Sequence, residues 1–166
     1  MDINSIKRDP RDWDIAFMEM AYSISFLSKD TSSKIGAIAV STCKTKIASG
    51  FNGFPMGFPD YEKWWNNRDP NTELFTKYDL VDHAERNLID YCNEDMTDWT
   101  MYVTIKPCYK CMLAIFKAGI KKVFYSNKLK TVMDLEDKKG DFIAGVGNIE
   151  LELIDKSELF KFAKEL

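Results

Sequence analysis

Several features that define other classes of protein are missing from this sequence of 166 residues. No apolar run reaches the roughly 20 residues that a membrane-spanning helix needs, so we expect no membrane segment. The first ten residues contain no apolar stretch of the kind found in a secretory signal. Acidic residues (26) outnumber basic residues (23), which gives a formal charge of -3. Long nucleic acids usually require a basic binding face, so this balance argues against a long nucleic acid as the partner.

Cysteine and histidine are scarce, with four cysteines and one histidine in the whole chain. Two of the cysteines form the pair Cys108-x-x-Cys111, a spacing that is typical of metal binding rather than of a disulfide framework. This usage fits a reducing compartment, and we predict a cytoplasmic protein. We interpret Cys43 as a turn or surface thiol and Cys92 as a small residue of the core.

The rest of the composition is that of a folded globular protein, with 45% hydrophobic and 30% charged residues. The sequence shows no internal repeat, no low-complexity tract and no linker. We therefore predict one domain that spans residues 1–166.

The order of the hydrophobic patterns predicts an α/β domain. Apolar residues at helical spacing predict a first helix within 12–27, and two short apolar runs at 35–40 and 46–51 predict a β-hairpin. Further helices are expected near 83–92, 107–118, 131–138 and 156–166, and further strands near 99–105, 122–125 and 149–154. This alternation predicts helices packed on a mixed five-stranded sheet.

Two stretches between these elements lack a regular period. Residues 50–59 contain three glycines and two prolines and must form a shaped loop. The three phenylalanines of this loop should pack or line a pocket, because exposing them would be costly. Residues 60–79 form an aromatic and polar insertion, which is either a lid or oligomer contact, or a place where Trp64 and Trp65 pack onto the domain surface.

The residues with the clearest chemistry lie in the motifs His83-Ala84-Glu85 and Pro107-Cys108-Tyr109-Lys110-Cys111. One imidazole and two thiolates provide three ligands for a tetrahedral zinc ion and leave a fourth position for water, as in catalytic zinc sites. Both motifs lie at predicted helix starts, where the helix dipole favours thiolate over thiol. We therefore predict that His83, Cys108 and Cys111 bind Zn²⁺, which lowers the pKa of a bound water toward neutrality.

Glu85 is not needed as a metal ligand, and we predict that it is the catalytic residue. Hydrolytic deamination needs one proton taken from water, one delivered to a ring nitrogen and one delivered to the leaving amine, and a single carboxylate can move all three. The combination of H-x-E with P-C-x-x-C is the signature of zinc-dependent base deaminases. A redox C-x-x-C pair would leave His83 and Glu85 unexplained, and a structural zinc site normally recruits a fourth Cys or His.

Beyond this signature, residues 13 to 125 resemble the zinc-dependent cytidine and deoxycytidylate (dCMP) deaminases, and the dCMP deaminases most closely. The matching segments are Ser28-Lys29-Asp30, Ser33-Lys34-Ile35-Gly36-Ala37, Gly50-Phe51-Asn52-Gly53-Phe54-Pro55-x-Gly57, Lys77-Tyr78, His83-Ala84-Glu85-x-Asn87, Met101-Tyr102-Val103, Pro107-Cys108-x-x-Cys111 and Ala118-Gly119-Ile120-Lys121.

This resemblance implies a three-layer α/β/α cytidine-deaminase-like fold and hydrolysis of dCMP to dUMP and ammonia, a reaction that feeds dTMP synthesis. It implies zinc on the three predicted ligands and a proton shuttle at Glu85. It also implies that Asn52 and the backbone of Ala84 contact the nucleotide, and Lys29 and Lys34 are our candidates for the phosphate. Finally, it implies a homo-oligomer, commonly a hexamer, that is regulated by dCTP and dTTP with Mg²⁺.

Three alternatives stay open from the sequence. The substrate could be another cytosine nucleotide or nucleoside, including 5-substituted dCMP. A tRNA or other nucleic-acid deaminase would need cations and stacking aromatics along a groove, which Trp64, Trp65 and the lysines of 121–130 supply in part, although the acidic balance opposes it. A catalytically silent, zinc-stabilised nucleotide-binding regulator would have no need to keep Glu85.

Overall fold

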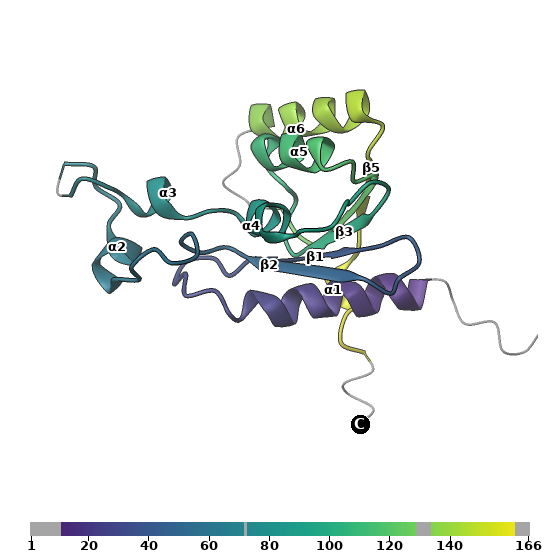
Figure 1. Ribbon diagram of the computed structural model, residues 1–166, viewed down its shortest axis with the longest axis horizontal. Helices are drawn as coiled ribbons and strands as arrows, with labels where there is room; N and C mark the ends of the chain where they lie inside the picture. Colours follow the sequence, from purple (N-terminus) through teal and green to yellow (C-terminus); the bar gives the residue numbers. More distant parts are fainter. Residues whose placement is uncertain (1–10, 72, 129–133, 162–166) are drawn as a thin grey trace, which may run out of the picture.

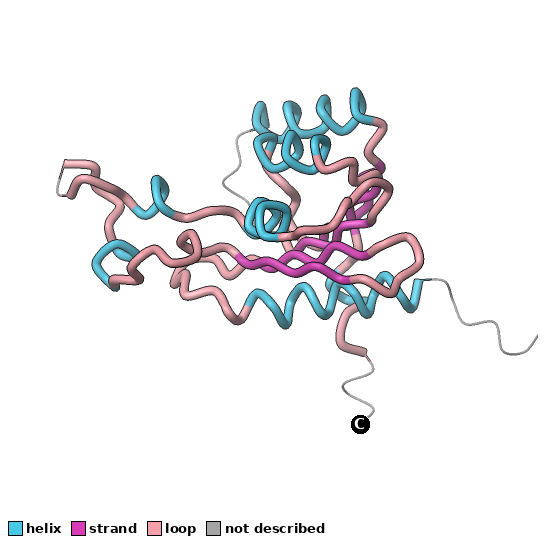
Figure 2. Tube along the Cα trace, viewed as in Figure 1, coloured by secondary structure: helices cyan, strands magenta, loops and turns pink. Residues whose placement is uncertain are grey.

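A computed structural model describes residues 11–71, 73–128 and 134–161. Its middle layer is a five-stranded sheet with the strand order β2-β1-β3-β4-β5 (Figures 1 and 2). The strands are β1 (Gly36–Val40), β2 (Ile47–Phe51), β3 (Thr100–Val103), β4 (Lys122–Tyr125) and β5 (Glu150–Leu153). β1 is antiparallel to both β2 and β3, whereas β3, β4 and β5 run parallel. The predicted mixed sheet of five strands is confirmed.

Alternating side chains along the central strands divide the apolar core between the two faces of the sheet. In β1, Ala37 and Ala39 belong to one core cluster, whereas Ile38 and Val40 belong to the other. The helices are α1 (Arg11–Ser25), which packs on the face of Ile38, and α4 (Ala84–Tyr91), α5 (Tyr109–Lys117) and α6 (Asp134–Gly147), which lie on the opposite side (Figure 1). The three-layer α/β/α arrangement follows from this division. Among the described residues, no helix has the length and apolar character required to cross a membrane.

Two glycines allow helices to approach the sheet closely. A Cβ atom on Gly50 in β2 would lie 2.5 Å from the carbonyl oxygen of Ala84 and 2.7 Å from the amide nitrogen of Leu88. A Cβ atom on Gly36 in β1 would lie 2.0 Å from the carbonyl oxygen of Ala21 in α1. Because α4 begins at Ala84, Gly50 sets how closely the first turn of this helix rests on the sheet.

The chain between β2 and α4 forms a projection that we call the arm (residues 53–82), and Figure 1 shows it extending away from the layered body. It contains two short helices, α2 (Glu62–Asn66) and α3 (Lys77–Leu80), where the sequence had indicated no period. An isolated β-bridge closes the base of the arm, with N···O distances of 3.1 and 2.9 Å between Gly53 and Asp82.

The aromatic side chains of the loop and the arm pack against one another. Trp65 is buried and stacks on Phe54, with ring centroids 4.1 Å apart. Trp64 contacts Phe58 at 5.3 Å between centroids. The three phenylalanines of residues 50–59 line a cavity of about 250 Å³ together with Trp65. The prediction that these phenylalanines pack or line a pocket is confirmed. The tryptophans pack on the phenylalanines of the arm itself, and a lid or oligomer role for the arm stays a prediction.

The C-terminal part of the chain differs most from the sequence prediction. The helix α6 extends over Asp134–Gly147, whereas the pattern predicted a short helix at 131–138, of which 131–133 lie outside the described residues. Its three glycines lower helix propensity and concealed its length. One of them, Gly140, is buried, and a Cβ atom there would lie 3.7 Å from the carbonyl oxygen of Pro107. Packing on α5 therefore stabilises a helix that the local sequence disfavours.

The predicted terminal helix over 156–166 is wrong for its described part. Lys156–Glu158 form only a single 3₁₀ turn, and Phe160 has a φ angle of 58°, which is incompatible with a continuing helix. Ile154 and Leu159 are buried in the core cluster on the α1 side. These two side chains hold the segment against the α1 side of the sheet, and residues 162–166 lie outside the described part.

Candidate active site

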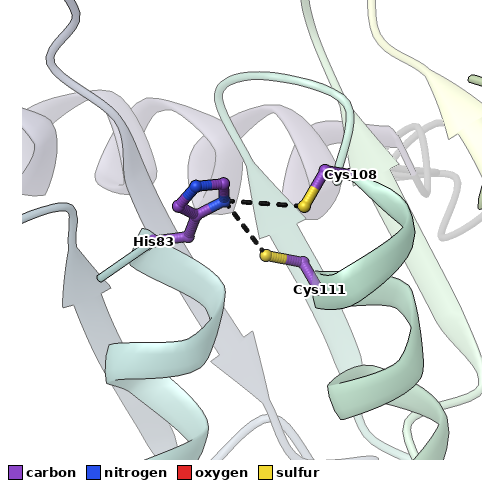
Figure 3. Close-up of side chains that lie close together, drawn as sticks. All are labelled: His83, Cys108 and Cys111. Carbon is purple, nitrogen blue, oxygen red and sulfur yellow. Dashed lines mark hydrogen bonds between the residues drawn. The ribbon is translucent and has the colours of Figure 1, made fainter. Parts of the chain in front are cut away.

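Three side chains with metal-binding atoms converge at the starts of α4 and α5 (Figure 3). His83 immediately precedes α4, Cys108 immediately precedes α5, and Cys111 lies in the first turn of α5. The Nδ1 atom of His83 lies 3.3 Å from Sγ of Cys111 and 3.6 Å from Sγ of Cys108. All three ligand atoms lie within 4.8 Å of one another. The structure therefore brings together the three residues that the sequence predicted.

This donor set fits zinc. Zn–N bonds of about 2.0 Å and Zn–S bonds of about 2.3 Å at tetrahedral angles require N···S separations of about 3.5 Å, which match the two observed distances. Within the described part of the chain, no fourth histidine, cysteine or carboxylate joins the group. Cys43 is exposed and Cys92 packs half-buried against the core, as interpreted from the sequence. Three protein ligands with one remaining position are typical of a catalytic zinc site.

Contacts among the three ligands perturb their protonation. Hydrogen bonds from Cys111 and His83 lower the pKa of Cys108 to about 4, against the opposing effect of burial. The contact with Cys108, together with burial, raises the pKa of Cys111. Hydrogen bonding to Cys108 raises the pKa of His83. Metal ligation requires deprotonated thiols and a neutral imidazole, so metal binding at this group releases protons.

Glu85 lies in the first turn of α4, two residues beyond His83, and only 4% of its surface is exposed. Burial raises the pKa of its carboxyl group, and the charge of His83 acts in the opposite direction. A raised pKa brings a carboxyl group toward the range in which it can both accept and return a proton near neutral pH. The environment of Glu85 therefore suits a proton shuttle.

The start of α4 is held in place by Asn87, a residue of the motif His83-Ala84-Glu85-x-Asn87 whose role the sequence alone does not indicate. The side-chain amide of Asn87 donates a hydrogen bond to the carbonyl oxygen of Phe51 at 2.9 Å, and its backbone N–H donates to the carbonyl oxygen of His83 at 2.9 Å. Ala84 is fully buried. Its N–H belongs to the first turn, where a helix provides no internal acceptor, so it can bind a ligand.

A cavity of about 280 Å³ lies beside the metal-binding group. Its lining residues are Ile35, His83, Glu85, Ile105, Lys106, Pro107, Cys108, Lys128, Glu136 and Asp137. This volume suits one small molecule. The last three of these residues lie after β4, in the part of the chain for which the sequence predicted no site residue. Glu136 and Asp137 reach the cavity because α6 packs on α5, whereas Lys128 lies shortly after the end of β4. No local motif predicts these contacts.

Asn52 is buried, with 3% of its surface exposed, and its side chain bonds within the protein. Its Oδ1 accepts a hydrogen bond from the backbone N–H of Ile35 at 2.8 Å. Its Nδ2 donates to the carbonyl oxygen of Ser33 at 2.8 Å and to Oδ2 of Asp30 at 3.1 Å. Asn52 therefore positions Ile35 in the cavity wall, and both of its amide hydrogens already have acceptors.

The two lysines predicted to contact phosphate are not among the residues that line this cavity. Lys29 forms an exposed ion pair with Asp60. The Nζ atom of Lys34 donates to the carbonyl oxygen of Ser28 at 2.5 Å. Each lysine therefore has a partner within the protein.

A buried ion pair connects the arm to the loop that precedes β1. Nζ of Lys77 in α3 lies 2.5 Å from Oδ1 of Asp30, and the two side chains are 6% and 3% exposed. The same carboxylate oxygen accepts backbone N–H bonds from Ser32 at 2.7 Å and Ser33 at 3.2 Å. Burial acts to raise the pKa of Asp30, but these hydrogen bonds outweigh burial and lower it. No local pattern in the sequence indicates this pair, because its residues lie 47 positions apart.

Comparison with known proteins defines the class of this chain. The family model of the cytidine and deoxycytidylate deaminase zinc-binding region matches residues 11–127. The chain belongs to the cytidine and deoxycytidylate deaminase family, and the predicted resemblance, fold class and zinc cofactor are confirmed.

Individual relatives lie within the deoxycytidylate deaminases. The chain is 40% identical to the deoxycytidylate deaminase of Mus musculus over 126 residues, which cover 75% of this chain and 70% of the mouse protein. Identity to the deoxycytidylate deaminase of Homo sapiens is 36% over the same share of each chain. The fold is similar to the dCMP deaminase of cyanophage S-TIM5 in complex with dCMP and dUMP, with a TM-score of 0.66, 27% identity and coverage of 89% of this chain and 100% of the phage chain.

Proposed function

We propose that this protein is a zinc-dependent dCMP deaminase that converts dCMP and water into dUMP and ammonia. The observation that carries this proposal is the grouping of the His83, Cys108 and Cys111 ligand atoms beside a cavity that the buried Glu85 lines. The 40% identity to a deoxycytidylate deaminase supports dCMP as the substrate. When bound to this group, zinc supplies a water molecule whose pKa is lowered toward neutrality.

Glu85 moves the protons of the reaction. Its carboxylate takes a proton from the attacking water and delivers it to N3 of the cytosine ring as the water oxygen bonds to C4. It then transfers the second proton of the water to the amino group at C4, so that the C–N bond breaks with release of ammonia. The product carries a hydrogen on N3 and a carbonyl at C4, as in dUMP, and Glu85 returns to its starting charge.

Two further residues orient the substrate in this proposal. The backbone N–H of Ala84, in the first turn of α4, donates to the pyrimidine edge beside the metal-binding group. Asn52 contributes by holding Ile35 in the wall of the cavity. The buried position of Glu85 excludes bulk water from its carboxylate, which strengthens its interaction with the reacting atoms.

Assembly and regulation complete the proposal. We expect a cytoplasmic homo-oligomer, a hexamer by resemblance, that responds to dCTP and dTTP with Mg²⁺. Large apolar side chains on the outer surfaces of α5 and α6 support contact with other copies: Leu113, Phe116, Phe142 and Val146 are 41% to 71% exposed. Light scattering of the purified protein, with and without each nucleotide and Mg²⁺, tests the oligomer, and a monomer under every condition would contradict it.

An ammonia-release screen tests the reaction and the substrate together. The substrates are cytosine, deoxycytidine, dCMP, dCTP and 5-substituted dCMP, each assayed with the wild type, Glu85→Gln and the exposed control Glu62→Gln. We expect dCMP to be preferred, Glu62→Gln to match the wild type, and Glu85→Gln to keep zinc while losing about 10³-fold in kcat. Equal turnover of deoxycytidine would refute the substrate, and zinc-loaded protein that releases no ammonia from any compound would indicate a binding protein.

A further inference from the structure

The proposed substrate carries a phosphate group with up to two negative charges, so its binding site should offer a cation. Among the described residues that line the catalytic cavity, two are cationic, Lys106 and Lys128. Their surroundings differ, and this difference shows which one can bind a phosphate.

The ammonium group of Lys106 already binds two carboxylates of the protein. Its side chain is 6% exposed, and its Nζ lies 2.7 Å from Oδ1 of Asp137 and 2.6 Å from Oδ1 of Asp141. Its backbone N–H also donates to the carbonyl oxygen of Asn127 at 2.8 Å. Lys106 therefore fastens α6 to the turn that leads into Cys108, and it cannot turn to a ligand without leaving two carboxylates unpaired.

Lys128 is held much more loosely. Its side chain is 55% exposed, and its Nζ lies 3.6 Å from Oδ2 of Asp137. This distance exceeds the range of about 2.7–3.2 Å for a good N–H···O hydrogen bond, so the ammonium can give its hydrogens to a ligand.

The carboxylates near Lys128 have closer cationic partners than Lys128. Asp137 and Asp141 both pair with Lys106. Glu136 pairs with Lys139 at 2.6 Å. A phosphate that binds Lys128 therefore replaces one long ion pair, and every carboxylate keeps its short contact.

We propose that Nζ of Lys128 binds the 5′-phosphate of the nucleotide and thereby sets the preference for a nucleotide over a nucleoside. This inference rests on the proposed function. The cytosine ring lies at the end of the cavity formed by His83, Glu85 and Cys108, and the phosphate lies toward α6. Lys29 and Lys34, which the sequence suggested for this role, already have partners outside the cavity lining.

Steady-state kinetics of Lys128→Gln with dCMP and deoxycytidine test this inference. A lost charge-assisted contact to phosphate should raise KM for dCMP by about 10- to 100-fold. We expect kcat for dCMP to stay within about twofold and kcat/KM for deoxycytidine to be unchanged, because the chemistry takes place at the other end of the cavity. Lys128→Arg should recover most of the affinity for dCMP. The control is Lys46→Gln, which should behave as wild type. Lys46 directly precedes β2, is not among the residues that line the cavity, and forms an exposed pair with Glu94.

The outcomes separate this inference from the proposed function. Wild-type protein that fails to deaminate dCMP refutes the function itself. Active wild type with an unchanged KM in Lys128→Gln overturns the assignment of Lys128, and so does an equal loss for dCMP and deoxycytidine, which would indicate a structural role. If Lys128→Gln does not fold, Lys128→Met applies the same test with a neutral side chain of similar length, and zinc content and Tm establish that each variant is intact.

Discussion

The buried pair of Lys77 and Asp30 provides the sharpest test of how the arm contributes to the stability of the fold. Replacing Lys77 with methionine keeps the length of the side chain but removes its charge and its hydrogen bond. Asp30 then remains buried with 3% of its side chain exposed and no cation to balance it. Removing one partner of a buried ion pair typically costs about 3–5 kcal/mol, because the other charge is left uncompensated.

The remaining contacts of Asp30 place the expected cost at the lower end of that range. Its carboxylate keeps two backbone N–H bonds, from Ser32 and Ser33, and one side-chain bond from Asn52. We therefore expect Lys77→Met to lower the free energy of unfolding by about 3 kcal/mol. For a protein of this size, each kcal/mol shifts Tm by about 2–4 °C, so the expected loss in Tm is about 6–12 °C.

The acid stability of the fold should change in a defined direction. The pKa of Asp30 is lowered in the folded state, so its ionised form stabilises the fold above the ordinary carboxyl pKa of about 3.9. This contribution is lost as the pH falls through the lowered pKa. Because Lys77 provides part of that lowering, Lys77→Met should raise the pKa of Asp30 and move acid unfolding to a higher pH.

Urea unfolding, thermal unfolding and a pH series measure these effects. The control Lys46→Met breaks an exposed pair with Glu94 and should leave the free energy of unfolding unchanged within error. The double variant Asp30→Asn with Lys77→Met should recover part of the lost stability, since no buried charge remains. A cost below about 1 kcal/mol for Lys77→Met would refute the reasoning, because the pair would then contribute no more than a surface contact.

Three other predictions concern the residues that position the site. Cys108→Ser should lose most of its bound zinc in a metal analysis. The control Cys43→Ser changes an exposed thiol and should keep its zinc. Equal zinc contents in the two variants would show that Cys108 is not a ligand. The Cβ atom of Gly50→Ala would lie 2.5 Å from the carbonyl oxygen of Ala84 and should displace the first turn of α4. We expect kcat in the dCMP assay to fall by about 10-fold or more. A wild-type kcat would show that α4 tolerates the displacement. Lys106→Met should lower the urea stability by no more than about 1 kcal/mol, because the Asp137 and Asp141 carboxylates that lose their shared cation are 31% and 54% exposed and stay hydrated. A loss of several kcal/mol would show that the Lys106 pairs hold α6 in place.

Much of the fold could be predicted from the sequence because its signals are local. The alternation of Ala37, Ile38, Ala39 and Val40 defines a strand with two buried faces, and the described core contains these side chains on opposite sides. The helix over Asp134–Gly147 was underestimated, because packing of α6 on α5 outweighs the low helix propensity of its glycines. The terminal helix failed for the converse reason, since Leu159 is fixed in the core by a chain that turns at Phe160.

By itself, the sequence determined the metal-binding group and the proposed proton shuttle. Their chemistry depends on residue type and on spacing within single helix starts, where His83 and Glu85 lie two residues apart and Cys108 and Cys111 lie three apart. Tertiary structure decided the rest of the cavity. In the folded chain, the side chain of Asn52 positions Ile35 in the cavity wall. Lys77 and Asp30, 47 positions apart in the sequence, form a buried ion pair. Residues of α6 line the far wall of the cavity. Such contacts depend on how layers pack over long sequence separations, and no local pattern encodes which side chains then meet.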